Sequence, residues 1–137
     1  METYIQKLLE PKNLILVCLL LHILADFNLQ DCLADMKQQR WWIRACKTCK
    51  VSIDIYEFDW LAALLIHSVM WSLITFAPLL FIVKSTVTLY WVLAINTAIH
   101  AVVDHWKCNK LQINLWSDQI LHVFQIIITL ALVTKLF

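Results

Sequence analysis

The sequence predicts an all-α integral membrane protein, a bundle of about four transmembrane helices with an amphipathic helix at the membrane interface. Of its 137 residues, 61% are hydrophobic and 15% are charged, whereas soluble domains have about 45–50% and about 25%. Long apolar stretches fill most of the chain, so residues 1–137 are expected to form a single transmembrane domain. The expected partner is therefore the lipid bilayer. A formal net charge of +1 offers no basic surface for nucleic acid.

Four apolar stretches are long enough to be considered as membrane crossings. They cover about residues 14–30, 60–83, 85–105 and 115–134. The first is short for the ~20 apolar residues that a crossing needs. In the second, Pro78 is expected to kink the helix near its end. The fourth is the clearest, because it is almost wholly aliphatic after Gln125.

Residues 31–58 have a different composition from the four stretches. This segment mixes charged side chains with Trp41, Trp42 and Ile43. Such a mixture is typical of a helix that lies in the plane of the membrane interface. We therefore expect an interfacial helix followed by a loop.

The distribution of lysine and arginine predicts the orientation. The two loops after the first and third stretches carry seven of these residues, and the opposite side carries four. Basic residues favour the cytoplasmic side. The sequence thus predicts a multi-pass protein of the cytoplasmic (inner) membrane, with the N- and C-termini outside.

Histidine and aspartate recur at helical spacing in these stretches. Three i, i+4 pairs share one helix face each, and the second stretch adds a single histidine: the residues are His22 and Asp26, His100 and Asp104, Asp118 and His122, and His67. Because consecutive helices cross in opposite directions, all of them map to the half of the membrane on the side of the basic loops. We expect a polar layer that opens toward the cytoplasmic interface.

Three carboxylates beside four imidazoles need charge compensation at membrane depth. An ionised carboxylate there costs ~2.5–3.5 kcal/mol, and a bound divalent metal ion would offset that cost. Imidazole and carboxylate suit zinc, which is favoured, and also manganese or iron. The expected ligands are His22, Asp26, His67, His100, Asp104, Asp118 and His122. Two alternatives stay open: a proton or ion relay without a fixed metal, and hydrogen bonding that only holds the helices together.

The spacing of these residues resembles a known sequence pattern. H-I-L-A-D-F-N-L-Q from His22, H-A-V-V-D-H-W-K from His100 and D-Q-I-L-H from Asp118 are similar to a family of small bacterial and phage membrane proteins, catalogued as a domain of unknown function. Its pattern is HxxxDFxLQ, a lone His, HxxxDxxK and DQxxH. The resemblance covers essentially the whole chain. It implies that the polar positions of the family also include Gln30, Lys37, Lys107 and Gln119.

The polar layer supports one leading hypothesis about function. A metal with open positions activates water. We therefore expect a metal-dependent hydrolase that acts on a lipid or anionic headgroup at the cytoplasmic leaflet. The resemblance also includes a distant likeness to membrane-bound metal-dependent hydrolases. Catalytic roles are expected for Asp26, Asp104, Asp118 and Lys107, and anion binding for Gln30, Lys37, Lys107 and Gln119. The alternatives are an oligomeric ion or proton channel or transporter, in which the expected partner is a second copy of the chain in a homo-oligomer, and a non-catalytic membrane partner subunit. Sparse polar residues in the outer halves of the helices favour a site over a path.

Overall fold

The computed structural model describes residues 10–136. In this part of the chain all regular secondary structure is helical, and there is no strand. Three helical stretches are long and apolar enough to cross a membrane: Ile53–Thr75, Thr86–Cys108 and Leu115–Val133. The stretch Asn13–Asn28 is apolar but shorter. The all-α class is therefore confirmed, together with three helices that could span a membrane. The fourth crossing stays a prediction.

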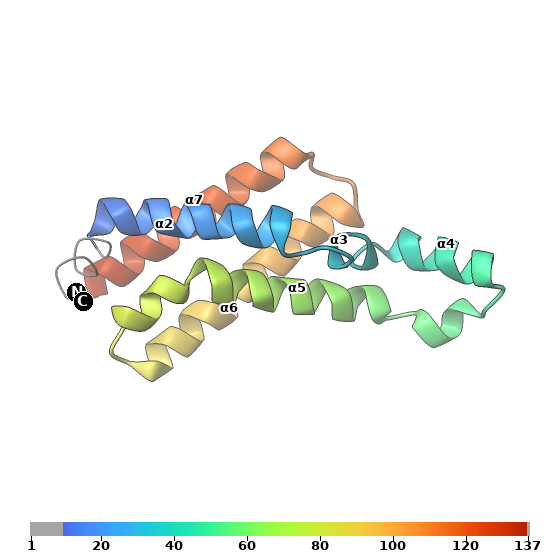
Figure 1. Cartoon of the computed structure of the whole chain (residues 1–137), viewed down its shortest axis with the longest axis horizontal. Coiled ribbons are helices and arrows are strands. Elements are labelled where there is room, and N and C mark those ends of the chain that lie inside the picture. Colours follow the sequence, from blue (N-terminus) through green and yellow to red (C-terminus); the bar gives the residue numbers. More distant parts are fainter. Residues whose placement is uncertain (1–9, 137) are drawn as a thin grey trace.

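Four helical segments form the bundle (Figure 1). They are α2 (Pro11–Ile23) with its continuation η1 (Leu24–Asn28), α5 (Asp59–Thr75), α6 (Thr86–Cys108) and α7 (Leu115–Leu136). Helix α5 packs against α6, and α2 lies against both α5 and α7. Figure 1 shows that α2 begins and α7 ends at one end of the bundle, whereas α3 and α4 extend from the other. The residues of the predicted polar layer lie toward the α3–α4 end.

The continuation of α2 is a π-helix. Its wider turn is closed by a hydrogen bond from Leu29 N to Leu24 O of 3.0 Å. Single π-helical turns inside α-helices are frequently found at functional sites. Asp26 lies in this turn and is buried.

The second predicted stretch ends earlier as an α-helix than expected. Helix α5 stops at Thr75, and Pro78 lies in the 3₁₀ turn η3 (Ala77–Phe81). Proline lacks an N–H and disfavours α geometry in the residue before it. The helix therefore ends before the proline, where the sequence predicted a kink. Helix α6 then begins after Ser85, whose Oγ accepts a hydrogen bond of 3.3 Å from Thr88 N as an N-cap.

The connection between η1 and α5 is itself partly helical. It contains α3 (Leu33–Met36), α4 (Gln39–Cys49) and the 3₁₀ turn η2 (Ile53–Tyr56). Asn109, just after α6, fastens it to the bundle: its Nδ2 donates to Lys37 O at 3.0 Å, and its Oδ1 accepts from Gln39 N at 2.8 Å. The helix expected in this segment is present, and its place at a membrane interface stays a prediction.

The bundle is apolar outside and partly polar inside. Large apolar side chains are exposed along the outer faces of α5, α6 and α7, as expected of surfaces that face lipid. One half of the interior is an apolar core, formed by Leu14, Cys18, Ala25, Trp71, Phe76, Leu79, Val83, Ile126, Leu130 and Val133. The other half, toward α3 and α4, holds the buried aspartates and histidines.

Candidate metal centre

Six acidic and imidazole side chains converge inside the bundle, and each is at most 3% exposed. We call them the His–Asp cluster: Asp26 from η1, His67 from α5, His100 and Asp104 from α6, and Asp118 and His122 from α7. The structure thus brings together residues of four segments. They were expected to meet because they share one depth in antiparallel helices.

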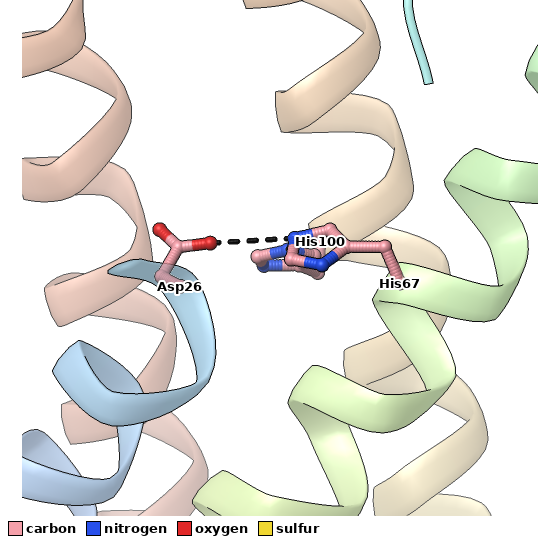
Figure 2. A group of neighbouring side chains, drawn as sticks. All are labelled: Asp26, His67 and His100. Carbon is pink, nitrogen blue, oxygen red and sulfur yellow. Dashed lines mark hydrogen bonds and ion pairs between the residues drawn. The ribbon is translucent and has the colours of Figure 1, made fainter. Parts of the chain in front are cut away.

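His67 lies at the centre of one half of the cluster. Its Nε2 is 3.3 Å from Asp26 Oδ1 and 3.4 Å from Asp104 Oδ2. It is also 3.2 Å from His100 Nε2. Figure 2 shows Asp26, His67 and His100 directed toward one another from three different segments.

His122 occupies the other half of the cluster. Its Nε2 lies 3.4 Å from Asp118 Oδ1 and 3.6 Å from Asp104 Oδ1. Its ring stacks on that of His100, with centroids 4.2 Å apart. Asp104 therefore faces both halves, one oxygen toward each.

These separations suit ligands of a common metal ion. Two donors, each ~2.05 Å from a tetrahedral zinc ion, lie about 3.3 Å apart. The distances around His67 and His122 run from 3.2 to 3.6 Å, whereas N–H···O hydrogen bonds are typically ~2.9–3.0 Å. Among the described residues, three overlapping groups place their ligand atoms within 4.8 Å of one another: Asp26, His67 and His100; His100, Asp104 and His122; Asp26, Asp118 and His122.

Several buried atoms of the cluster have no hydrogen-bond partner. Among the described residues seven such side-chain atoms occur, and five belong to the cluster: His100 Nδ1, Asp104 Oδ1, Asp118 Oδ1, and both ring nitrogens of His122. Burying a polar atom without a partner costs about 1–3 kcal/mol. A set of ligand-type atoms that the protein leaves unsatisfied at one place fits the binding of a cation there.

A directed chain of hydrogen bonds supports the cluster from one side. Trp71 Nε1 donates to His22 Nδ1 at 2.8 Å. Since the indole can only donate, His22 carries its proton on Nε2, which donates to Gln119 Oε1 at 3.1 Å. The amide of Gln119 then donates to Asp26 Oδ2 at 2.8 Å and to Asp118 Oδ2 at 3.0 Å.

These hydrogen bonds involve His22, which the sequence predicted as a metal ligand, and Gln119, which it predicted as an anion-binding residue. Both nitrogens of His22 are engaged in hydrogen bonds, and His22 belongs to none of the three ligand groups found in residues 10–136. Gln119 contacts carboxylates of the cluster directly. The structure therefore places both residues where they orient Asp26 and Asp118.

Two lysines approach the carboxylates. Lys37 Nζ lies 2.5 Å from Asp104 Oδ2 and donates to Gln30 Oε1 at 3.0 Å. Lys107 Nζ lies 2.6 Å from Asp118 Oδ2. The side chain of Lys37 is 6% exposed and that of Lys107 is 28% exposed. Lys107 therefore lies between the buried cluster and the surface of the bundle. The four residues expected to bind an anion all contact the cluster or its lysines.

Two residues that shape the site were not predicted from the sequence. Trp71 was not assigned a polar role, yet it donates to His22 and stacks on His100, with centroids 4.1 Å apart. Its signal was the i+4 spacing from His67, which places both on one face of α5. Asn109 fastens the segment that carries Lys37, and no periodic pattern indicates it.

A second polar group lies beyond Trp71, in the half of the bundle where polar residues were expected to be sparse. Gln125 Nε2 donates to Asn96 Oδ1 at 2.9 Å, and Thr129 Oγ1 donates to the same oxygen at 3.0 Å. The apolar core packs around the same level of the bundle. These residues satisfy much of one another's hydrogen bonding and contain no acid or imidazole.

Comparisons with known proteins add no assignment: no family model, curated protein or solved structure matches the chain. The resemblance to the family of small bacterial and phage membrane proteins stays an expectation. The geometry of the cluster is consequently the basis for inferring a function.

Proposed function

We propose that this protein is a membrane-embedded, metal-dependent hydrolase that acts on a lipid or anionic headgroup at the cytoplasmic leaflet. One observation carries the proposal. Three aspartates and three histidines converge in a buried cluster whose donor atoms are spaced as metal ligands and are partly unsatisfied. Zinc is the favoured ion, and manganese or iron also suit imidazole and carboxylate ligands.

Electrostatics supports a bound cation. The cluster contains three carboxylates, and within residues 10–136 two ammonium groups, those of Lys37 and Lys107, lie against them. Buried charges need compensation by partners or metals. A divalent ion would complete the compensation and engage the atoms that the protein leaves unsatisfied.

Hydrolysis fits the surroundings of the ion. A metal with an open position activates water and polarises an ester oxygen. The water oxygen would bond to the phosphorus or carbonyl carbon while a carboxylate of the cluster takes its proton. The ester P–O or acyl C–O bond would then break, and the same carboxylate would return the proton to the departing alkoxide, which leaves as the alcohol. Lys107 is a partly exposed cation at the edge of the cluster, and this exposure supports a role in meeting an anionic headgroup.

An oligomeric ion or proton channel or transporter is the second candidate. The observation that favours it is the polar group of Asn96, Gln125 and Thr129 in the half beyond Trp71. Against it stands the apolar core at that level, which leaves a pore only on an oligomer axis. Ion flux across vesicles that contain the protein separates the two candidates. A non-catalytic partner subunit would give neither flux nor product.

The first prediction concerns metal content. Protein purified in detergent without chelators should contain at least one zinc, manganese or iron ion per chain, because several ligand atoms are already assembled. Elemental analysis measures it. His67→Asn should lower the content, and His105→Asn, which lies outside the cluster and stacks on Trp60, should not. A wild-type content near zero would contradict the proposal.

The second prediction concerns the support of the carboxylates. Trp71→Phe keeps an aromatic ring but removes the donor to His22 Nδ1, so the proton position that orients Gln119 is no longer fixed. Loss of such a partner typically lowers metal affinity ~10–100-fold. Competition with a chromophoric chelator measures zinc affinity, with Trp60→Phe as the matched control. Equal affinities of Trp71→Phe and wild type would show that the hydrogen bonds from Trp71 through His22 to Gln119 do not affect zinc affinity.

The third prediction concerns orientation. We propose that the loops at residues 31–58 and 106–114 face the cytoplasm and that both termini lie outside, following the distribution of basic residues. Single cysteines placed in these loops, in a cysteine-free background, should resist an impermeant thiol reagent in intact cells. They should react after the membrane is permeabilised. Ready labelling in intact cells would reverse the orientation.

A further inference from the structure

We propose that the His–Asp cluster binds two divalent ions, bridged by the carboxylates of Asp26 and Asp104. This inference rests on the proposed metal-dependent function and specifies how many ions the site holds. Three observations support two ions: some residues occur in more than one ligand group, the two oxygens of Asp104 face different histidines, and the distances within each half of the cluster suit metal ligands.

Each pair of the three ligand groups shares one residue, which is Asp26, His100 or His122. Asp26 occurs with His67 and His100 in one group and with Asp118 and His122 in another. A single imidazole nitrogen binds one ion, whereas a carboxylate has two oxygens with several lone pairs. Among the three shared residues, Asp26 is thus the one of the type that can serve two ions at once.

Asp104 faces the same two sets of histidines. Its Oδ2 lies 3.4 Å from His67 Nε2 and 3.7 Å from His100 Nε2. Its Oδ1 lies 3.6 Å from His122 Nε2. Asp104 is therefore a second carboxylate between the two halves, with one oxygen for each ion. The third ligand group, which joins Asp104 to His100 and His122, reflects this intermediate place.

The remaining ligands divide between the two positions. His67 and His100 would complete the first position, and Asp118 and His122 would complete the second. Metal pairs of this kind lie ~3.5–4 Å apart and stabilise both the attacking and the leaving oxygen in hydrolysis. Histidine and carboxylate from facing helices form such centres in helix bundles.

One central ion does not account for the arrangement. Opposite ligands of a six-coordinate ion with bonds of ~2.1 Å are only about 4.2 Å apart. The six residues nevertheless fall into three overlapping groups of three, and no group in the described part of the chain contains all of them within 4.8 Å. No group in the described residues contains both His67 and His122. An ion held by His67 and His100 would therefore leave His122, whose ring nitrogens both lack a hydrogen-bond partner, to a second ion.

The lysines are compatible with two ions. Lys37 donates to one lone pair of Asp104 Oδ2. Because this oxygen has a second lone pair, it can also bind an ion. Lys107 contacts Asp118 Oδ2, whereas the ligand-type contact with His122 uses Asp118 Oδ1. The second position is consequently the one beside the partly exposed lysine, and it is where an anionic substrate would arrive.

The test uses the full chain in detergent, freed of metal by a chelator. Equilibrium dialysis against Zn²⁺ and then Mn²⁺, followed by elemental analysis, should give two ions per chain. Electron paramagnetic resonance of the manganese form should show an exchange-coupled pair. One ion per chain, or two uncoupled ions, would overturn the bridged pair and leave the proposed metal function standing. No bound ion would overturn both.

A variant assigns the two positions. His122→Asn should reduce the content to one ion per chain and remove the coupled spectrum, because the second position loses its only imidazole. His105→Asn is the matched control and should retain two coupled ions. Should His122→Asn fail to fold, Asp118→Asn removes a ligand from the same position. Retention of a coupled pair in a folded variant would count against the assignment.

Discussion

Asp104→Asn is expected to abolish metal-dependent hydrolysis while the bundle still folds. Asparagine nearly preserves the volume of aspartate but removes its charge and one of its two ligand oxygens. In the structure these oxygens face His67 and His122 at 3.4 and 3.6 Å. Loss of a residue that only supports a ligand typically costs ~10–100-fold in activity, so loss of a direct ligand should cost roughly 100-fold or more.

The measurement is a paired assay on vesicles of phosphatidylethanolamine and phosphatidylglycerol that contain the protein. Release of headgroup or acyl product is followed with added Zn²⁺ or Mn²⁺, and ion flux is followed in the same vesicles. Asp35→Asn, an exposed carboxylate on the α3 side, is the matched control and should behave as wild type. Flux without product from the wild type would instead promote the channel, whose conduction would survive neutralisation of one wall charge.

Much of the cluster was predictable from helical spacing alone. Pairs such as His100 and Asp104 share a helix face at i, i+4, and consecutive membrane helices alternate in direction. Together these two rules place the polar residues of four segments at one depth, where the structure brings six of them together. The helices themselves were predictable because long apolar stretches have few alternatives in a bilayer.

The directions of the side chains were not predictable. His22 lies at the expected depth, but its ring nitrogens form hydrogen bonds with Trp71 on α5 and Gln119 on α7. That choice depends on how three helices rotate and pack, and spacing along one helix does not fix it. The π-helical turn at Asp26 is likewise hidden, since an apolar sequence gives no sign of where one extra residue enters a turn.

The early end of α5 has a simpler cause. Pro78 was expected to kink the helix. Whether a proline kinks or ends a helix depends on whether the turn that follows can pack against the core. Phe76 and Leu79 are fully buried around the proline. The turn that contains them contributes to the apolar core, which stabilises a helix end at Thr75 over a continued, bent helix.

Lys37→Met is expected to destabilise the metal-free protein strongly and the zinc-bound protein much less. The ammonium of Lys37 is buried and lies 2.5 Å from Asp104 Oδ2. Methionine has a similar length but no charge, so the carboxylate would lose its nearest cation. Removing one partner of a buried ion pair costs about 3–5 kcal/mol. Because a metal ion at the cluster would compensate the same carboxylate, added zinc should restore most of the loss.

Thermal unfolding in detergent, with a chelator and with Zn²⁺, measures both effects. Lys110→Met changes an exposed lysine at the same end of the bundle and should unfold as wild type does. The decisive quantity is the difference between the zinc-induced stabilisation of Lys37→Met and that of wild type. If the ion and Lys37 compensate the same charge, the variant gains more from zinc than wild type does. Equal gains would mean that zinc binds away from Asp104, and the cluster would then lose its role as the metal centre.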